Sequence, residues 1–404
     1  MKHVPFLFFA FFTCLYAQGQ EEIHLSVASE VTQEQAPVTV SLQSQKSVKS
    51  AMVLVNGKEV PCQIDDLDGD GQPDELAFLT DINKGEKQQV VVRLSPEERE
   101  SPYPTRTYAE LMLRNPKVKE KNKHDIYLSS ISIDSNTKEP YLVLHHHGIA
   151  FENELVAMRI YMDERQTIDL YGKFHKGLEL HDTQFYTSAA QKAQGYGDDV
   201  LWVGNTFGLG ALRGWDGDKP TMISPVRQRS QRIVCMGPVR TIVEMTDRGW
   251  SYDTNGTPID MTQRYTLYAG HRDLKVSVTF TPTPSPMLFS TGIINVKGSE
   301  EYSDKDGLRG CWGTDWPATD TINWKRETVG LGIYIPSKYR DKEWPANKDN
   351  YLFTIKPYNA QLHYYLTYTS ANEDFGFHSA KTWFAFMKDW KKRLANPPIV
   401  HMEP

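Results

Sequence analysis

Short β-prone runs follow one another along almost the whole chain, and this feature constrains the fold most. Residues 274–280, 328–335 and 363–369 are rich in β-branched, aromatic or alternating apolar residues, as strands are. From about residue 107 to residue 369, no clear helical period separates such runs. Many strands without intervening helices are typical of sandwiches. The sequence therefore predicts a mainly β protein with a large sandwich.

The length of 404 residues is enough for two domains. We expect residues 20–100 to form a small, sandwich-like β-domain, in which Asn56 and Gly57 make a two-residue hairpin turn. Three prolines between residues 95 and 105 indicate a linker. We expect residues 105–404 to form the larger domain.

The two ends of the chain carry their own signals. The apolar run at residues 4–17 follows Lys2 and is too short to span a bilayer comfortably. It is followed by small residues at the spacing typical of a signal-peptide cleavage site. We expect residues 1–19 to be a signal peptide and the protein to be periplasmic, with secretion or surface anchoring left open. Near the other end, Ser379 precedes a broad apolar face that a proline pair terminates. This pattern predicts a C-terminal helix.

Composition argues against several functions. The formal net charge is -6 and the basic residues are scattered, so there is no nucleic-acid footprint. No second apolar run is long enough to span a bilayer. The glycines of residues 208–214 do not follow a strand and lead into a helix, as the glycines of a dinucleotide-binding motif do. We therefore expect no organic cofactor.

The most specific local motif is an acidic loop that begins at residue 66. Four aspartates occupy positions 1, 3, 5 and 9 of a calcium-type loop: Asp66, Asp68, Asp70 and Asp74. Gly71 at position 6 permits the sharp turn, but position 12 is Ala77 instead of glutamate, and the residues around it look like a strand. We therefore expect a structural Ca²⁺ site in a β setting, with an acidic surface turn as the alternative.

The densest group of chemically useful side chains lies at residues 145–173. Polar residues recur there at every second position, in two sets: Arg159, Tyr161 and Asp163, then Asp169, Tyr171 and Lys173. Each set shares one face of a strand, because side chains alternate between faces. The opposite faces are apolar and a short polar connection separates the sets. The pattern predicts a hairpin with one charged face, although a solvated face would look similar.

The same stretch carries a family resemblance. The motifs lie at residues 146–148, 151–154, 159–161 and 168–173, and are extended by residues 199–204 and the C-terminal helix. Over most of residues 105–400, the chain resembles the exported Bacteroidetes family catalogued as domain of unknown function 4861. The resemblance implies a galactose-mutarotase-like β-supersandwich and a link to polysaccharide-utilisation systems for uronic-acid-containing glycans. It also implies dehydration of a terminal uronic acid.

Removal of water from a 4-hydroxyuronosyl end makes three demands. A base takes the C5 proton, a cation or donors stabilise the enolate-like charge, and an acid protonates the leaving hydroxyl. Histidine, arginine and tyrosine meet these demands, so the candidate catalytic residues are His146, His147, Arg159, Tyr161 and Tyr171. The candidates for holding the oligosaccharide are Glu152, Glu154, Lys173, Trp202 and Trp215.

Two other classes fit the same residues. A glycoside hydrolase would use paired carboxylates, with Glu152 or Glu154 and Asp169 as candidates. A non-catalytic glycan-binding protein would need only aromatic and polar groups. A catalytic metal lacks support, because His145 and His147 share a strand face without an assignable third ligand. The products distinguish the classes: elimination creates an ultraviolet-absorbing double bond, hydrolysis creates reducing ends, and binding creates neither.

Overall fold

The computed structural model describes residues 21–403, except residues 46, 253–255 and 285–286. The expected signal peptide, residues 1–19, lies outside these residues. Strands predominate in the described part of the chain, where no helix is long and apolar enough to cross a membrane. The predicted mainly β fold with sandwich character is confirmed.

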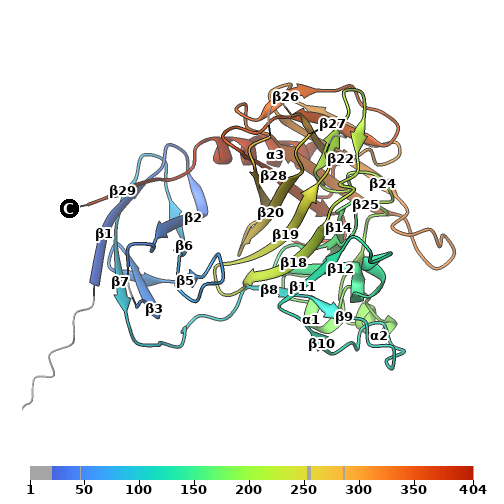
Figure 1. Ribbon diagram of the computed structural model, residues 1–404. Helices are drawn as coiled ribbons and strands as arrows, with labels where there is room; N and C mark the ends of the chain where they lie inside the picture. Colours follow the sequence, from blue (N-terminus) through green and yellow to red (C-terminus); the bar gives the residue numbers. More distant parts are fainter. Residues whose placement is uncertain (1–20, 46, 253–255, 285–286, 404) are drawn as a thin grey trace, which may run out of the picture.

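Two sheets form the smaller unit, at the left of Figure 1. One has the order β29 (Ile399–Met402), β1 (Glu21–Ala28), β7 (Lys87–Ser95), β3 (Ser50–Val55) and β4 (Lys58–Val60). The other has the order β2 (Gln33–Ser41), β6 (Glu75–Ile82) and β5 (Cys62–Asp65). Their apolar faces share one core. The predicted hairpin turn is confirmed between β3 and β4, where Asn56 and Gly57 have φ of 49° and 81°.

The last strand of the chain returns to this smaller unit. β29 pairs antiparallel with β1, with Met402 opposite Leu25, and Figure 1 shows the C-terminus beside β1. It covers an edge of β1 that would otherwise expose unpaired backbone groups. The strand therefore departs from the expected range of 105–404 for the larger domain. Sequence order could not show which open edge the end of the chain would reach.

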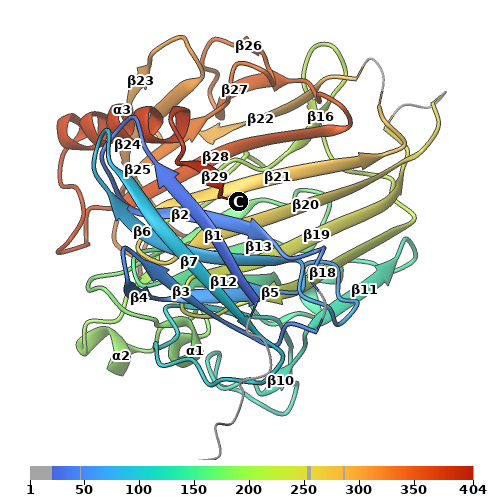
Figure 2. The same ribbon diagram turned by 90° about the vertical axis from the view of Figure 1, so that its left-hand side faces the viewer.

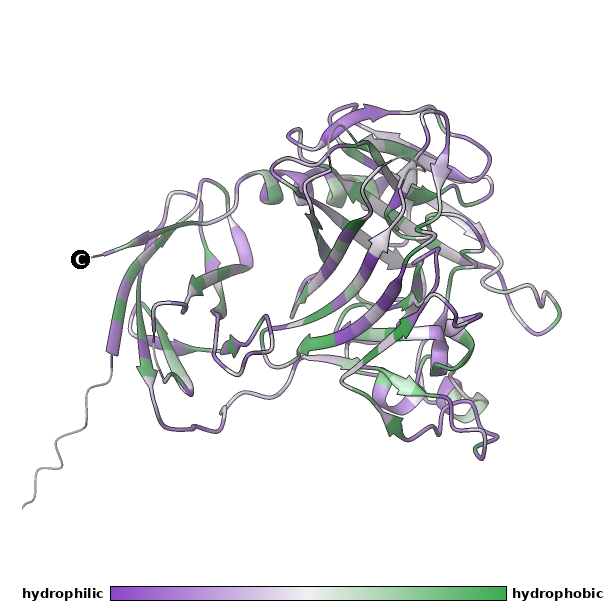
Figure 3. Ribbon diagram, in the orientation of Figure 1, coloured by the Kyte–Doolittle hydropathy of each residue, from purple (hydrophilic) through white to green (hydrophobic). Residues whose placement is uncertain are grey.

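One layer of the larger unit is a nine-stranded antiparallel sheet. Its order is β11 (Ser130–Asp134), β18 (Gln228–Cys235), β19 (Arg240–Trp250), β20 (Ile259–Tyr268), β21 (Asp273–Thr281), β28 (Gln361–Ser370), β25 (Glu327–Tyr334), β24 (Leu308–Asp315) and β23 (Glu300–Ser303). Apolar and polar bands alternate along β18, β19 and β20 in Figure 3. This alternation places one apolar face against the main core.

Two five-stranded sheets form the second layer. The first has the order β15 (Asp198–Asp199), β14 (Ile168–Gly172), β13 (Ala157–Tyr161), β12 (Gly148–Asn153) and β8 (Thr107–Glu110). The second has the order β17 (Pro220–Thr221), β16 (Arg213–Trp215), β22 (Phe289–Ile294), β27 (Asn350–Ile355) and β26 (Arg340–Glu343). The predicted charged hairpin is confirmed as β13 and β14, with Arg159 opposite Asp169. Its apolar face, including Ile160 and Leu170, packs into the main core.

The remaining elements are short, apart from the C-terminal helix. They are β9 (Met112–Leu113), β10 (Ile126–Tyr127), η1 (Pro140–Leu142), η2 (His145–His147), α1 (Leu180–Thr183), α2 (Ala189–Ala193) and α3 (Ala380–Ala395). The prediction of a C-terminal helix is confirmed, and the Ser379 hydroxyl accepts the Thr382 N–H at its start.

The smaller sandwich docks on the nine-stranded sheet, and Figure 2 shows β1 and β7 crossing in front of it. The Leu67 carbonyl accepts hydrogen bonds of 2.6 Å from Arg232 and 3.0 Å from Arg264. Arg240 and Asp65 form a buried ion pair of 2.7 Å. The start of the acidic loop is therefore part of the contact between the two units.

Helix α3 provides a direct test of the packing on β24 and β25. Trp383 is fully buried, and its indole N–H donates to the Leu331 carbonyl. We expect Trp383→Ala to lower the free energy of unfolding by about 3–5 kcal/mol, because it leaves a cavity in the packing of the helix on the sheet. Urea unfolding measures this change. The exposed Lys381→Ala on the same helix should change the free energy of unfolding by less than about 0.5 kcal/mol. Equal losses of stability in the two variants would contradict the packing of Trp383 on the sheet.

Candidate active site

A cavity of about 600 Å³ opens beside the charged face of the β13–β14 hairpin. This is the usual size of a small-molecule site. Its walls also include parts of segments 120–122, 185–204 and 317–324. The chemically active residues on these walls include His147, Arg159, Tyr161, Arg165, Asp169 and Asp199. The cavity therefore combines a base, phenol and carboxylate groups, and cations.

Arg159 organises one wall of the cavity. Its Nη2 donates to Asp169 at 2.6 Å, to Asp199 at 3.3 Å and to the Tyr161 hydroxyl at 3.2 Å. Its Nη1 donates to the Tyr186 hydroxyl at 3.3 Å. The side chain is only 5% exposed. The guanidinium therefore holds two carboxylates and two phenols in place, so it is not free to form the expected fork with a substrate carboxylate.

His147 lines the cavity, and one hydrogen bond defines its tautomer. Its Nδ1 lies 3.3 Å from the Tyr141 carbonyl oxygen, and a ring nitrogen can only donate to a carbonyl. In the neutral ring, Nε2 is therefore the acceptor. Burial, and next the positive charge of Arg159, lower the pKa of His147 to about 4. The imidazole is consequently neutral at pH 7 and able to take a proton.

Tyr161 lies directly against this histidine. The two rings are stacked, with centroids 5.6 Å apart and planes 12° apart. Burial, and next the charge of Asp169, raise the pKa of the Tyr161 phenol well above its ordinary value, while Arg159 opposes this rise. The phenol therefore keeps its proton at neutral pH, beside a cation that would stabilise a phenolate.

Arg165 supplies a positive charge on the same side. The guanidinium lies 5.2 Å from the centroid of the Tyr161 ring. Its Nε and Nη2 are held by Asp163, and no interaction of Nη1 is found in the described part of the chain. Lys121 also lines the cavity and lies over the Tyr186 ring, 5.1 Å from its centroid. These groups could receive an anionic substrate.

Asp199 is the second carboxylate on the Arg159 wall. Burial, and next the charge of Asp169, raise the pKa of Asp199 well above its ordinary value. The Arg159 guanidinium opposes this rise, because its positive charge favours the ionised carboxylate.

His146 lies behind the cavity wall and does not line it. Its side chain is fully buried, and its Nε2 is 3.1 Å from Oε1 of the buried Glu110. Tyr108 donates to the other oxygen of Glu110 at 3.0 Å. Burial lowers the pKa of His146 to about 3 and raises that of Glu110 to about 8. The structure thus separates the two expected bases and leaves only His147 in the cavity.

Three other expected site residues, Glu152, Glu154 and Lys173, also lie away from the cavity lining. Glu152 and Lys173 form a fully buried ion pair of 2.6 Å. Glu154 pairs with Arg106 near the smaller sandwich. These contacts point to structural roles, and they remove both glutamates from the expected carboxylate pair of a hydrolase.

Tyr171 and Trp215 are the remaining two of the expected residues that do not line the cavity. The Tyr171 hydroxyl lies 2.8 Å from a Glu179 oxygen and 2.7 Å from the Gly197 carbonyl. Trp215 is buried against Trp344, with centroids 5.1 Å apart. Trp202, in contrast, lines the cavity and is 51% exposed.

Sequence reasoning missed several cavity residues. Arg165 lies in the short connection between the two strands of the hairpin. The charge of that connection did not by itself indicate a role for Arg165. Asp199 belongs to the family motif at residues 199–204, and its closeness to Trp202 in the sequence was a usable signal. Lys121, Tyr186 and Trp324 come from segments distant in the chain, for which the sequence holds no signal.

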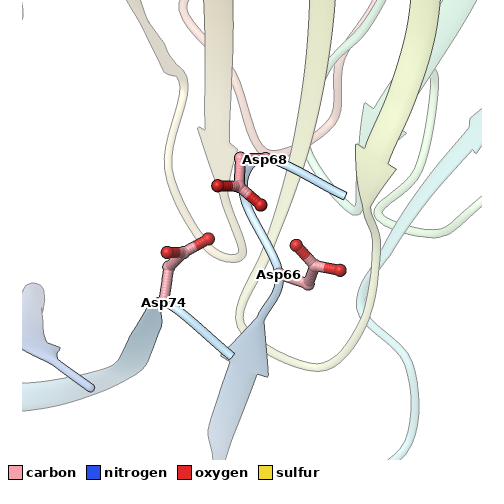
Figure 4. A group of neighbouring side chains, drawn as sticks. All are labelled: Asp66, Asp68 and Asp74. Atoms are coloured by element: carbon pink, nitrogen blue, oxygen red, sulfur yellow. The ribbon is translucent and has the colours of Figure 1, made fainter. Parts of the chain in front are cut away.

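The acidic loop brings three of its four aspartates together. Oxygens of Asp66, Asp68 and Asp74 lie within 4.8 Å of one another, as Figure 4 illustrates. Asp70 is not part of this group, and its Oδ1 accepts the Gln72 N–H at 2.7 Å. Backbone N–H groups of Gly69 and Gly71 lower the pKa of Asp66. Three clustered carboxylates fit a hard cation such as Ca²⁺, which prefers oxygen ligands.

Comparison with known proteins gives a family and distant structures. The family described as "Domain of unknown function (DUF4861)" matches residues 25–400. No curated protein matches. Among solved structures, a glycosyl hydrolase family 38 protein from Enterococcus faecalis is 9% identical, with a TM-score of 0.47, and the match covers 95% of this chain and 47% of that one.

A second solved structure, an alpha-mannosidase from Enterococcus faecalis V583, gives similar values. It is 10% identical, with a TM-score of 0.45, over 95% of this chain and 46% of that one. This chain thus spans about half the length of both proteins. TM-scores below 0.5 are too low for this likeness to bear on the function.

The buried Glu110 predicts a pH dependence of stability. Because burial raises the folded-state pKa from 4.5 to about 8, the folded protein holds a proton between these values that the unfolded chain releases. This contribution to stability is therefore lost as the pH rises through that window. We expect Glu110→Gln to become more stable relative to the wild type between pH 5 and pH 8, by on the order of 3 kcal/mol.

Urea unfolding at both pH values measures this change. The exposed Ile322→Ala, which changes no titratable group, should show a difference from the wild type that does not vary with pH. If the free energies of unfolding of Glu110→Gln and the wild type changed by the same amount between pH 5 and pH 8, the raised pKa of Glu110 would be contradicted.

Proposed function

Since the chain belongs to the family described as "Domain of unknown function (DUF4861)", we propose its function from the cavity: it is a carbohydrate-active enzyme, a carbon–oxygen lyase. It removes water by β-elimination from the terminal uronic acid of an oligosaccharide during polysaccharide degradation. We place it in the periplasm, on the sequence evidence for a signal peptide at residues 1–19. One observation carries this proposal: a neutral histidine, a protonated phenol and a guanidinium adjoin one another on the cavity wall.

His147 is the general base. Its Nε2 takes the C5 proton of the uronic acid, which the neighbouring carboxylate acidifies. The Tyr141 carbonyl fixes the ring and its tautomer, so the lone pair stays in the cavity. The pKa of about 4 keeps the base unprotonated at neutral pH, although it also makes the base weak before the substrate enters.

Arg165 supplies the second role. As C5 loses its proton, negative charge spreads onto the substrate carboxylate, and a positioned cation stabilises that charge most when it is largest. Arg165 replaces Arg159 here, because the donors of Arg159 are engaged by Asp169, Asp199, Tyr161 and Tyr186. The ion pair with Asp163 holds the Arg165 side chain in place.

Tyr161 supplies the third role. Its proton passes to the departing 4-hydroxyl oxygen as the C4–O bond breaks, and the electrons of the C5–H bond form the C4–C5 double bond. Water and a 4,5-unsaturated uronate leave the site. The Nη2 of Arg159, 3.2 Å from the phenol oxygen, stabilises the phenolate until the proton on His147 returns to it through solvent.

Hydrolysis remains the alternative with a structural observation in its favour. Asp169 and Asp199 form a carboxylate pair in the cavity, and Asp199 has a raised pKa, as a general acid requires. Both carboxylates bind the same Nη2 atom of Arg159, so they lie on one side of the cavity. Hydrolases place their carboxylates on either side of the scissile bond, and elimination therefore fits better.

Product analysis on uronic-acid-terminated oligosaccharides tests this function. We expect ultraviolet absorption with a mass loss of one water. His147→Ala should lower kcat by about 10²–10⁴-fold, the usual contribution of a general base. Tyr161→Phe should have an effect of similar size, whereas the exposed His175→Ala should leave turnover unchanged.

Other products would overturn the proposal. New reducing ends without absorption would indicate hydrolysis, and binding without any product would indicate a glycan-binding protein. Near-normal turnover of His147→Ala would mean that the base is assigned incorrectly.

We also propose that the acidic loop binds Ca²⁺ for stability and takes no part in the chemistry. The grouping of Asp66, Asp68 and Asp74 supports this role. The hydrogen bonds of the Leu67 carbonyl to the nine-stranded sheet link the loop to the contact between the two units. A cation that rigidifies this loop would therefore stabilise the docked arrangement.

Chelation tests the calcium proposal. We expect EDTA to lower the Tm of the wild type and excess Ca²⁺ to restore it, because a ligand of the folded state stabilises that state. Asp68→Asn should abolish this response, whereas Asp70→Asn, outside the group, should retain it. A wild-type melting curve that does not change with EDTA would contradict Ca²⁺ binding.

A further inference from the structure

Trp202 is shared by the catalytic cavity and a second hollow. It lines the cavity together with Trp324. It also lines a hollow of about 420 Å³ together with Trp316. Since half of the Trp202 side chain is exposed, an aromatic surface lies at the boundary between the two spaces.

The loop of residues 316–326 brings the other two tryptophans to this boundary. It connects β24 to β25 and projects at the right of Figure 1. The Asp320 carboxylate accepts the backbone N–H groups of Ile322 and Asn323 at 3.0 and 3.1 Å, which orders its tip. Lys192, paired with Asp198, lies 4.6 Å from the centroid of Trp324. These contacts hold Trp324 against the far wall of the cavity.

From this arrangement we propose that the hollow lined by Trp202 and Trp316 is a second sugar-binding subsite, with these two indole rings as stacking surfaces. The identity of the substrate rests on the proposed function: the terminal uronic acid lies beside His147, and the following sugars run over Trp202. The apolar C–H face of a sugar ring covers an indole while its hydroxyls stay hydrated. The enzyme therefore selects oligosaccharides over free uronic acid.

A third hollow, which Arg165 also lines, is less suited to stacking of sugar rings. Its lining includes Tyr141 but no tryptophan, whereas the hollow lined by Trp202 and Trp316 offers two indole rings. The placement of the tryptophans therefore favours a path of the chain over Trp202.

Binding measurements in the His147→Ala background test the subsite without turnover. The probes are glucuronic acid and glucuronic-acid-terminated oligosaccharides of two, three and four sugars, titrated by calorimetry. We expect affinity to rise about tenfold from one sugar to the longer probes, and Trp202→Ala or Trp316→Ala to abolish this gain. Ile322→Ala is the matched control, because Ile322 belongs to the same loop, is 91% exposed and lines neither space.

The outcomes separate the subsite from the chemistry. Equal affinity for all lengths, a gain that survives Trp202→Ala and Trp316→Ala, or no binding of any probe would overturn the subsite. Length-dependent binding that these variants abolish, in a protein whose wild type forms no unsaturated product, would keep the subsite and reject elimination. Unsaturated product formed without length dependence would keep elimination and reject the subsite.

Discussion

The buried ion pair between Arg159 and Asp169 determines the shape of the candidate site. The two residues face each other across β13 and β14, and their side chains are 5% and 2% exposed. Removing both charges from water is costly, and their mutual attraction offsets this cost only when further hydrogen bonds satisfy the remaining donors. Tyr161, Tyr186 and Asp199 provide those bonds. The same requirement therefore fixes the residues that line one wall of the cavity.

The backbone around the histidine triplet explains how two adjacent histidines acquire different surroundings. His146 and His147 have positive φ angles of 41° and 70°, which are uncommon for residues with a Cβ atom. Gly148 follows, and a Cβ atom there would lie 1.9 Å from the Ile160 carbonyl oxygen, so only glycine fits. His146 is thus held against Glu110, while His147 reaches the cavity. Such strained residues persist where the surrounding structure over-determines them.

The same kind of charge-assisted contact connects the two units of the chain. Arg232 and Arg264 both pair with Glu244 and both donate to the Leu67 carbonyl. A backbone carbonyl of the acidic loop thus completes an ion-pair network on the nine-stranded sheet. β29 adds a second connection, since the chain crosses back to pair with β1. The loop proposed to bind Ca²⁺ is therefore one of the places at which the smaller sandwich is held.

The sequence by itself determined the elements and their faces. Alternation placed Arg159 and Asp169 on one face of a hairpin and Ile160 and Leu170 in the core, because strand periodicity is a local property of the chain. Only the tertiary structure decided which polar residues share a cavity. Glu152 and Lys173 are buried as an ion pair and do not line the cavity. Lys121 and Trp324, from segments distant in the sequence, do line it. The physical reason is that partners, desolvation and free hydrogen-bonding capacity depend on contacts between segments far apart in sequence, which no local pattern contains.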